Sequence, residues 1–142
     1  MTRLARWFHV AGAATWFVGY LLLTSVVLPA LVRNSESDGL RDVAVLIVRT
    51  LTYAGAVTFG FGIVLIYETR GLGGLASMWG LLVGLSALIA LVLFVLGDGL
   101  ARRALLIATP DALRRAHLLS TLGLALTLVA LGLMTRTLYT FG

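Results

Sequence analysis

The chain of 142 residues has no cysteine, no lysine, only two prolines and few charged side chains. Without cysteine, neither a disulfide nor a thiolate metal site can form. Charged residues make up 12% of the chain and the hydrophobic set makes up 60%, which is more apolar material than a soluble domain of this length can bury. The scarcity of charge therefore predicts a protein whose partner is the lipid bilayer.

Four long apolar segments follow one another along the chain. A helix needs about 20 mainly apolar residues to cross about 30 Å of hydrocarbon. Four segments meet this requirement, at about residues 7–32, 43–67, 75–97 and 114–136. Strands of an outer-membrane barrel would be shorter and would alternate in polarity, which these segments do not. We expect an all-α fold, a single domain over residues 1–142, forming a four-helix transmembrane bundle with antiparallel neighbours.

The connections between these segments carry turn signals. Residues 34–39 are rich in Asn, Ser, Asp and Gly, and residues 68–74 contain three glycines. The third connection, residues 98–115, is expected to be the longest. Within it, Thr109, Pro110 and Asp111 have the pattern of a helix N-cap followed by a first-turn proline and a first-turn acid.

Arginine placement predicts the orientation in the membrane. Arg3 and Arg6 precede an apolar run about twice the length of a signal-peptide core, with no A-x-A site after it, so this segment is expected to remain as the first helix. Four spans put both termini and the second connection on one side. That side has four arginines, and the opposite side has six: Arg33, Arg41, Arg102, Arg103, Arg114 and Arg115. The excess predicts an inner-membrane protein with both termini outside the cytoplasm. Lipid headgroups account for the net charge of +5, so no nucleic-acid partner is expected.

Three side chains that can bind a soft metal lie at similar depth near the termini. His9 begins the first span, Met78 begins the third, and Met134 ends the fourth. An imidazole with thioethers suits Cu(I), and histidine with methionine also suits the iron of haem b. The alternative is that His9 is an interfacial histidine and that the methionines fill the core.

Small residues and one tryptophan continue the helix face that begins with His9. Gly12, Trp16 and Gly19 follow it at helical spacing. The absence of side chains at the glycines leaves room either for a flat cofactor or for a closely packed partner helix.

Two further polar residues belong to the opposite side of the membrane. His117 lies 17 residues, or about 25 Å, from Met134 along one helix. Because Met134 lies at the depth of His9, the two histidines are too far apart to share a metal within one subunit. The place of His117 at the headgroup level requires no special role. Arg49 lies about 9 Å below the surface. It can extend to the headgroups, pair with Asp98, or bind an anion such as a haem propionate or a lipid phosphate.

Gly80 and Gly84 form a GxxxG pair in the third span. Such a pair lets two helix backbones approach closely in lipid. It can serve packing inside the bundle, or it can join the chain to a homodimer or a larger membrane complex.

The first span resembles a known family. The stretch from Phe8 to Gly19, followed by Leu28 and Pro29, resembles helix 1 of the copper-resistance D (CopD) group and of its small four-span relatives of the DUF2269 type. That resemblance implies copper handling at the bacterial inner membrane, with His9 as the metal ligand and Trp16 and Gly19 as its structural companions.

A neighbouring family, the HemJ-type protoporphyrinogen oxidases, also has four spans and a helix 1 histidine linked to haem. This chain departs from it, because Ala30 follows Pro29 where that family has arginine, and because the third span has no lysine. We therefore expect a non-enzymatic protein that binds Cu(I) or haem b. The alternatives are a haem-dependent oxidase, with His9 on haem and Arg49 on a carboxylate, and a cofactor-free accessory subunit of a larger complex.

Overall fold

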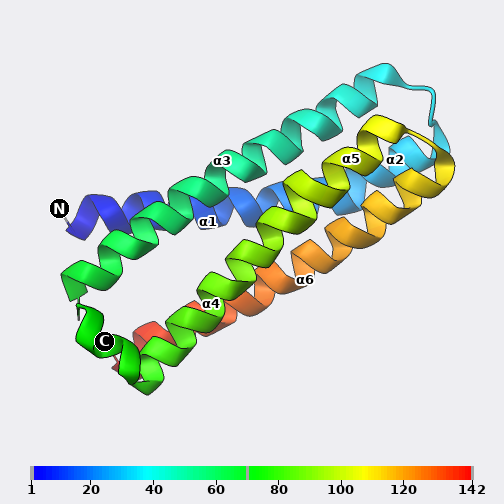
Figure 1. Ribbon diagram of the computed structural model, residues 1–142. Helices are drawn as coiled ribbons and strands as arrows, with labels where there is room; N and C mark the ends of the chain where they lie inside the picture. The colour runs from blue at the N-terminus through cyan, green and yellow to red at the C-terminus, as the bar shows by residue number, and fades with distance from the viewer. Residues whose placement is uncertain (1, 70, 142) are drawn as a thin grey trace.

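The described part of the chain is helical from one end to the other. The structure is a computed structural model, and it describes residues 2–69 and 71–141 (Figure 1). Within these residues, four helical stretches are long and apolar enough to cross a membrane: Arg3–Arg33, Asp38–Thr69, Met78–Ile107 and Pro110–Arg136. The predicted all-α fold, a four-helix transmembrane bundle, is confirmed.

Two of the four stretches change helix type along their length. The first consists of α1 (Thr2–Leu22), the π-helix η1 (Leu23–Val27) and α2 (Leu28–Arg33). The second is α3 (Asp38–Thr69), which a short 3₁₀-helix, η2 (Leu72–Ala76), connects to the third. The third consists of α4 (Met78–Phe94), the π-helix η3 (Val95–Ala101) and α5 (Arg102–Ile107), and the fourth is α6 (Pro110–Phe141).

The third connection is much shorter than the sequence predicts. Residues 98–107 are helical, so the first half of the connection expected over 98–115 is not a loop, and Ala108 and Thr109 alone separate α5 from α6. The helix continues because Ala101, Ala104 and Leu105 are buried against the bundle despite the charged residues between them. The predicted N-cap is confirmed, since the hydroxyl of Thr109 accepts a hydrogen bond from the backbone N–H of Ala112 at 3.3 Å.

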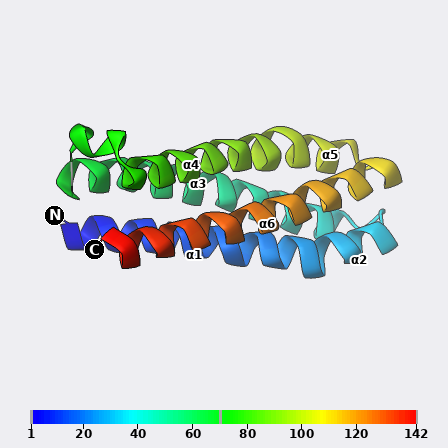
Figure 2. The ribbon, with the colours of Figure 1, turned by 90° about the horizontal axis from the view of Figure 1, so that it is seen from below.

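The helices pack in two pairs. α1 contacts α3 most extensively, and α4 contacts α6. Seen from below, α1 and α6 form one layer while α3 and α4 form the other (Figure 2). The N-terminal end of α1, the C-terminal end of α6 and the turn at η2 lie at one end of the bundle, as predicted (Figure 1). Arg70, one of the arginines in the orientation count, lies outside the described residues.

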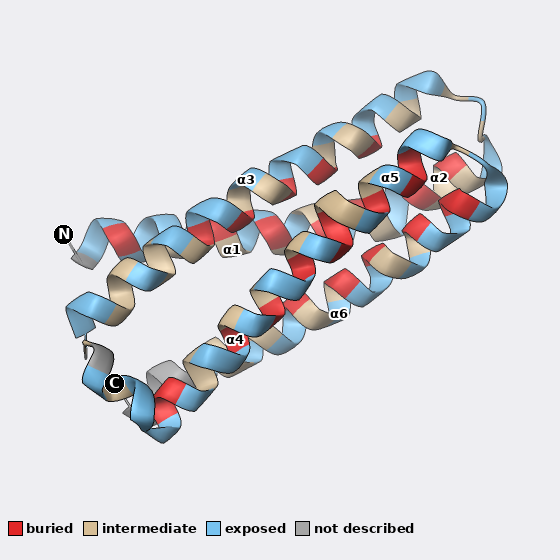
Figure 3. Ribbon diagram, in the orientation of Figure 1, coloured by how far each residue is buried: buried red, intermediate tan, exposed pale blue. Residues whose placement is uncertain are grey.

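The core is concentrated toward the end with the 34–37 and 108–109 connections (Figure 3). Leu28, Leu31, Leu105 and Leu113 are completely buried there. Around the outside, large apolar side chains are exposed, as Leu118 is at 71%. An apolar exterior of this kind is the surface expected of helices that face lipid.

Glycines mediate the closest helix contacts, but Gly80 and Gly84 do not form one. A side chain at Gly12 would collide with Thr58 on α3, and one at Gly123 would collide with the ring of Tyr20. Gly80 instead contacts the backbone of Leu75 in η2, and Gly84 has nothing within 4 Å of the position of a Cβ. The predicted GxxxG pair therefore makes no helix crossing inside this bundle.

Pro29 explains the first π-helix. Proline has no backbone N–H, so it leaves one carbonyl in the preceding turn without a donor. In η1 the N–H of Leu28 bonds to the carbonyl of Leu23, one residue further back than in an α-helix. This shift moves the unpaired carbonyl to Thr24, whose next donor would be the missing N–H of Pro29.

Candidate functional site

His9 is held by a hydrogen bond to the neighbouring helix. Its Nδ1 lies 2.7 Å from the backbone carbonyl oxygen of Thr58 on α3. A carbonyl can only accept, so Nδ1 carries the proton, and a neutral imidazole then keeps a free lone pair on Nε2. Hydrogen bonding of one ring nitrogen to a backbone carbonyl is the usual arrangement of histidines that ligate a metal through the other.

The surroundings of His9 leave space for the ring and restrict its orientation. Gly62 faces the imidazole, and a Cβ there would lie 3.2 Å from Cε1 of His9. Next to it, the rings of Phe8 and Phe61 stack with centroids 4.9 Å apart. The ring is half-buried between α1 and α3, near the end of the bundle that carries the termini.

The helix face between His9 and Gly19 is occupied by α3. Gly12 lies against Thr58 and Ala54, and Gly19 lies against Leu51. Trp16 is buried, contacts Gly55, and meets the ring of Phe94 edge-on at a centroid distance of 5.8 Å. Of the two uses open from the sequence, the partner helix is the one this face has, because α3 sits where a flat cofactor would lie.

Met134, unlike Met78, points into the bundle near the residues around His9. It lines a small, partly open cavity of about 40 Å³ together with Ala13, Trp16 and Thr58. Thr58 is the residue whose carbonyl holds His9, and Ala13 lies one helical turn from His9. Met78 follows the Ser77 cap of α4 and is 62% exposed. The structure thus places Met134, and not Met78, beside Ala13 and Thr58, which are neighbours of His9.

Oxygen ligands do not add to this site. The described residues contain no group of three or more His, Cys, Asp or Glu side chains that could hold a metal ion. The hydroxyl of Thr58 donates to the carbonyl of Ala54 at 2.8 Å. Any metal site at His9 would therefore depend on the imidazole Nε2 and a thioether.

Arg49 is separate from the His9 region. It lies nine residues, or about 13 Å, along α3 from Thr58, and its side chain is exposed. The pairing with Asp98 does not form, because Asp98 bonds Arg102 at 3.2 Å, one helical turn away. Of the three uses left open by the sequence, extension toward the headgroups and anion binding remain.

His117 has a structural role that the sequence analysis did not identify. Its Nε2 lies 3.1 Å from the carbonyl oxygen of Thr24 and donates to it. This is the carbonyl that the π-helix and Pro29 leave without a backbone donor. Proline in a span was the available signal, but the position of its partner on α6 depends on how the helices pack.

Tyr20 makes a comparable bond beside the second π-helix. Its hydroxyl donates to the carbonyl of Leu93, just before η3, at 3.2 Å. At the end of η3, the N–H of Arg102 reaches back five residues to the carbonyl of Gly97. Both π-helices are therefore accompanied by a side-chain donor from another helix.

Comparisons of the chain with protein-family models, with curated proteins and with solved structures each find no match.

Proposed function

We propose that this chain is an inner-membrane Cu(I)-binding protein of the copper-resistance D type, with Nε2 of His9 and the thioether of Met134 as ligands. The observation that carries the proposal is the hydrogen bond from Nδ1 of His9 to the Thr58 carbonyl, which leaves Nε2 free. Imidazole and thioether are ligands that Cu(I) accepts, and they need no carboxylate beside them.

Haem b fits the same residues less well. The cavity that Met134 lines measures about 40 Å³, and the glycine-rich face beyond His9 is covered by α3. Arg49, the residue that would hold a haem carboxylate, lies about 13 Å further along the bundle. These contacts support the metal ion over the macrocycle.

Two more features belong to the proposal. The six-to-four arginine excess favours an orientation with both termini, and with them His9, outside the cytoplasm. A copper site there would take the ion from that side of the membrane. With only two protein donors proposed, and no group of three or more His, Cys, Asp or Glu side chains among the described residues, the site would carry copper as cargo rather than hold it as a resident cofactor.

The test is the copper content of purified variants. The protein is loaded with Cu(I) under reducing conditions, desalted, and analysed for copper and iron, with an absorption spectrum from the same sample. His9→Asn is the main variant, because the asparagine amide can still donate to the Thr58 carbonyl while the metal-binding nitrogen is lost. His117→Asn is its control, since His117 lies at the other end of the bundle.

We expect His9→Asn to lose bound copper and His117→Asn to keep it. Met134→Leu should weaken retention, whereas Met78→Leu, which alters an exposed side chain, should not. Equal copper content in the wild type and His9→Asn would overturn the proposal. A Soret band that disappears in His9→Asn would replace copper with haem.

A further inference from the structure

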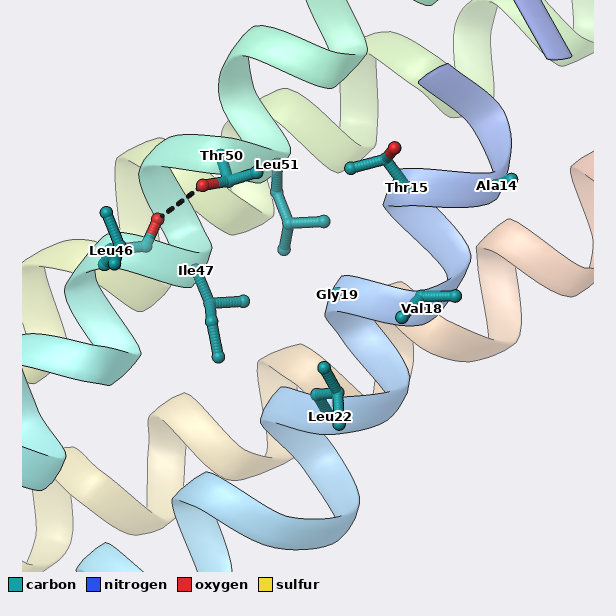
Figure 4. A pocket seen from close by; sticks show the side chains of 9 residues that line it. All are labelled: Ala14, Thr15, Val18, Gly19, Leu22, Leu46, Ile47, Thr50 and Leu51. Atoms are coloured by element: carbon teal, nitrogen blue, oxygen red, sulfur yellow. Dashed lines mark hydrogen bonds between the residues drawn. The ribbon is translucent and has the colours of Figure 1, made fainter. Parts of the chain in front are cut away.

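Two hydroxyls between α1 and α6 differ from the other hydroxyls of the bundle. A serine or threonine within a helix can donate to the carbonyl of the residue four positions earlier. Thr50 does so with Leu46 at 2.9 Å (Figure 4), and most hydroxyls of the described spans do the same. Thr24 and Ser120 do not, and the oxygens of both side chains are buried without a hydrogen-bond partner among the described residues.

These two oxygens lie where an unpaired polar group is unfavourable. Ser120 is completely buried, and Thr24 is half-buried with its side-chain oxygen covered. Nearly all buried polar groups in folded proteins bond either to another protein group or to an ordered water. The lipid around the bundle offers neither a donor nor an acceptor. A partner for the two hydroxyls must therefore come from inside the contact between the helices.

Both hydroxyls belong to one short stretch of the α1–α6 contact. Tyr20 meets Gly123 at one end of this stretch, and the carbonyl of Thr24 bonds His117 at the other. A helical side chain tilts toward the N-terminus of its own helix, so Thr24 tilts toward the level of Tyr20. Ser120 lies between His117 and Gly123 on α6 and tilts toward His117. Because the two helices are antiparallel, these tilts bring the two hydroxyls to the same level of the contact.

We infer that a water molecule bridges the hydroxyls of Thr24 and Ser120 between α1 and α6. The two oxygens do not bond each other directly, since each is without a partner. Water both donates and accepts, as each hydroxyl does, and one water joins two oxygens that lie up to about 5.5 Å apart. Buried waters are typically held by polar groups that have no other partner. This site is separate from His9 and does not rest on the copper proposal.

The water adds a second polar link between η1 and α6. Thr24 then bonds α6 through its carbonyl, which accepts from His117, and through its hydroxyl, which the water connects to Ser120. A π-helical turn within an α-helix frequently marks a functional position. In η1 such a turn presents both polar groups of one residue to another helix.

The stability of variants without these hydroxyls tests the bridge. Ser120→Ala and Thr24→Val each remove one hydroxyl and change the size of the side chain little. Their unfolding in mixed micelles of increasing dodecyl sulfate content is compared with that of the wild type and of the double variant. We expect each single substitution to raise the unfolding equilibrium constant about threefold, the effect of an average hydrogen bond between helices in a membrane. The double variant should be little worse than either single variant, because the loss of one hydroxyl already releases the water.

Matched control variants remove hydroxyls that bond within their own helix. Ser86→Ala is the control for the serine, since Ser86 is buried and its hydroxyl donates at 2.9 Å. Thr52→Val is the control for the threonine, since Thr52 is half-buried and its hydroxyl donates at 3.1 Å. Both should change the unfolding constant less than Ser120→Ala does. If the hydroxyls of Thr24 and Ser120 held no ligand, their removal would stabilise the protein. Stabilisation, or effects that simply add in the double variant, would overturn the inference.

Nuclear magnetic resonance detects the water itself. In isotope-labelled protein in deuterated detergent, magnetisation should pass from water to the backbone amide proton of Ser120. This transfer should be absent in Thr24→Val, and absent in the wild type at Val48, which is equally buried but has no hydroxyl. Non-additive substitutions without a water signal would mean that the two hydroxyls bond each other, which contradicts the bridge. A water signal at Ser120 that persists in Thr24→Val would contradict it as well.

Discussion

The hydrogen bond between His117 and Thr24 can be tested through the proline that makes it necessary. Thr24 has a carbonyl without a backbone donor because Leu28 bonds Leu23 and Pro29 has no N–H. His117→Ala removes the imidazole that bonds this oxygen. Thr24 is partly buried. An unpaired buried polar group costs about 1–3 kcal/mol, and hydrogen bonds between helices in membranes contribute up to about 1.7 kcal/mol, so the lower part of that range applies. We therefore expect a loss of about 1–2 kcal/mol in the free energy of unfolding.

Pro29→Ala changes that expectation. Alanine restores an N–H at position 29, which can donate to the carbonyl of Thr24 or, in an α-helical register, to that of Ser25. In this background, His117→Ala should cost less than about 0.5 kcal/mol, because the carbonyl no longer depends on the imidazole. The two substitutions are thus expected to be strongly non-additive.

The assay is reversible unfolding in mixed micelles of increasing dodecyl sulfate content, carried out on the wild type, both single variants and the double variant. Leu118→Ala provides the control, since it trims a lipid-facing side chain next to His117. An equal cost of His117→Ala with and without Pro29 would refute the proposed link between the proline and the histidine.

Three further predictions concern backbone and packing contacts. Gly12→Ala should destabilise the protein by about 1–3 kcal/mol, since its Cβ would collide with Thr58 and lie 2.9 Å from the carbonyl of Ala54. Gly84→Ala is the control in the same micelle assay. Its Cβ would contact nothing, so it should be neutral or slightly stabilising. Ala108→Gly should raise the free energy of unfolding by about 0.5–1 kcal/mol, because Ala108 has a φ of 57° and glycine adopts this conformation without strain; a decrease would contradict this reasoning. Tyr20→Phe should cost about 0.5–1.5 kcal/mol through the lost bond to Leu93, measured against Tyr53→Phe, whose exposed ring should change little.

The number of spans could be predicted because lipid imposes a length and a polarity that composition alone reveals. Their ends were less predictable: Asp98 and Arg102 looked like a loop, but they pair with each other on the outside of a helix whose other face is buried. The charge of a residue indicates that one side of a helix faces water or headgroups. It does not indicate where the helix ends.

The sequence predicted the depth at which the candidate ligands lie in the membrane, but not the direction in which their side chains point. Met78 and Met134 lie at the same end of the bundle, yet Met78 is exposed and Met134 lines a small cavity between helices. Which of them faces inward depends on the rotation of α4 and α6 about their axes, and that rotation follows from packing between segments far apart in sequence. The contact between His9 and Thr58 likewise depends on the register of α1 against α3.

The bond between Thr24 and His117 also has a consequence for the order in which the protein is synthesised and folds. The two residues are separated by 93 positions, so the ribosome adds His117 about 5–20 s after Thr24 at ordinary synthesis rates. During that interval the first span carries a carbonyl that no later part of the chain has yet reached. Lipid offers it no donor, which favours water or an insertion partner beside the first helix until the last one arrives. The final span thus completes the hydrogen bonding of the first, and a chain truncated before α6 would expose this defect.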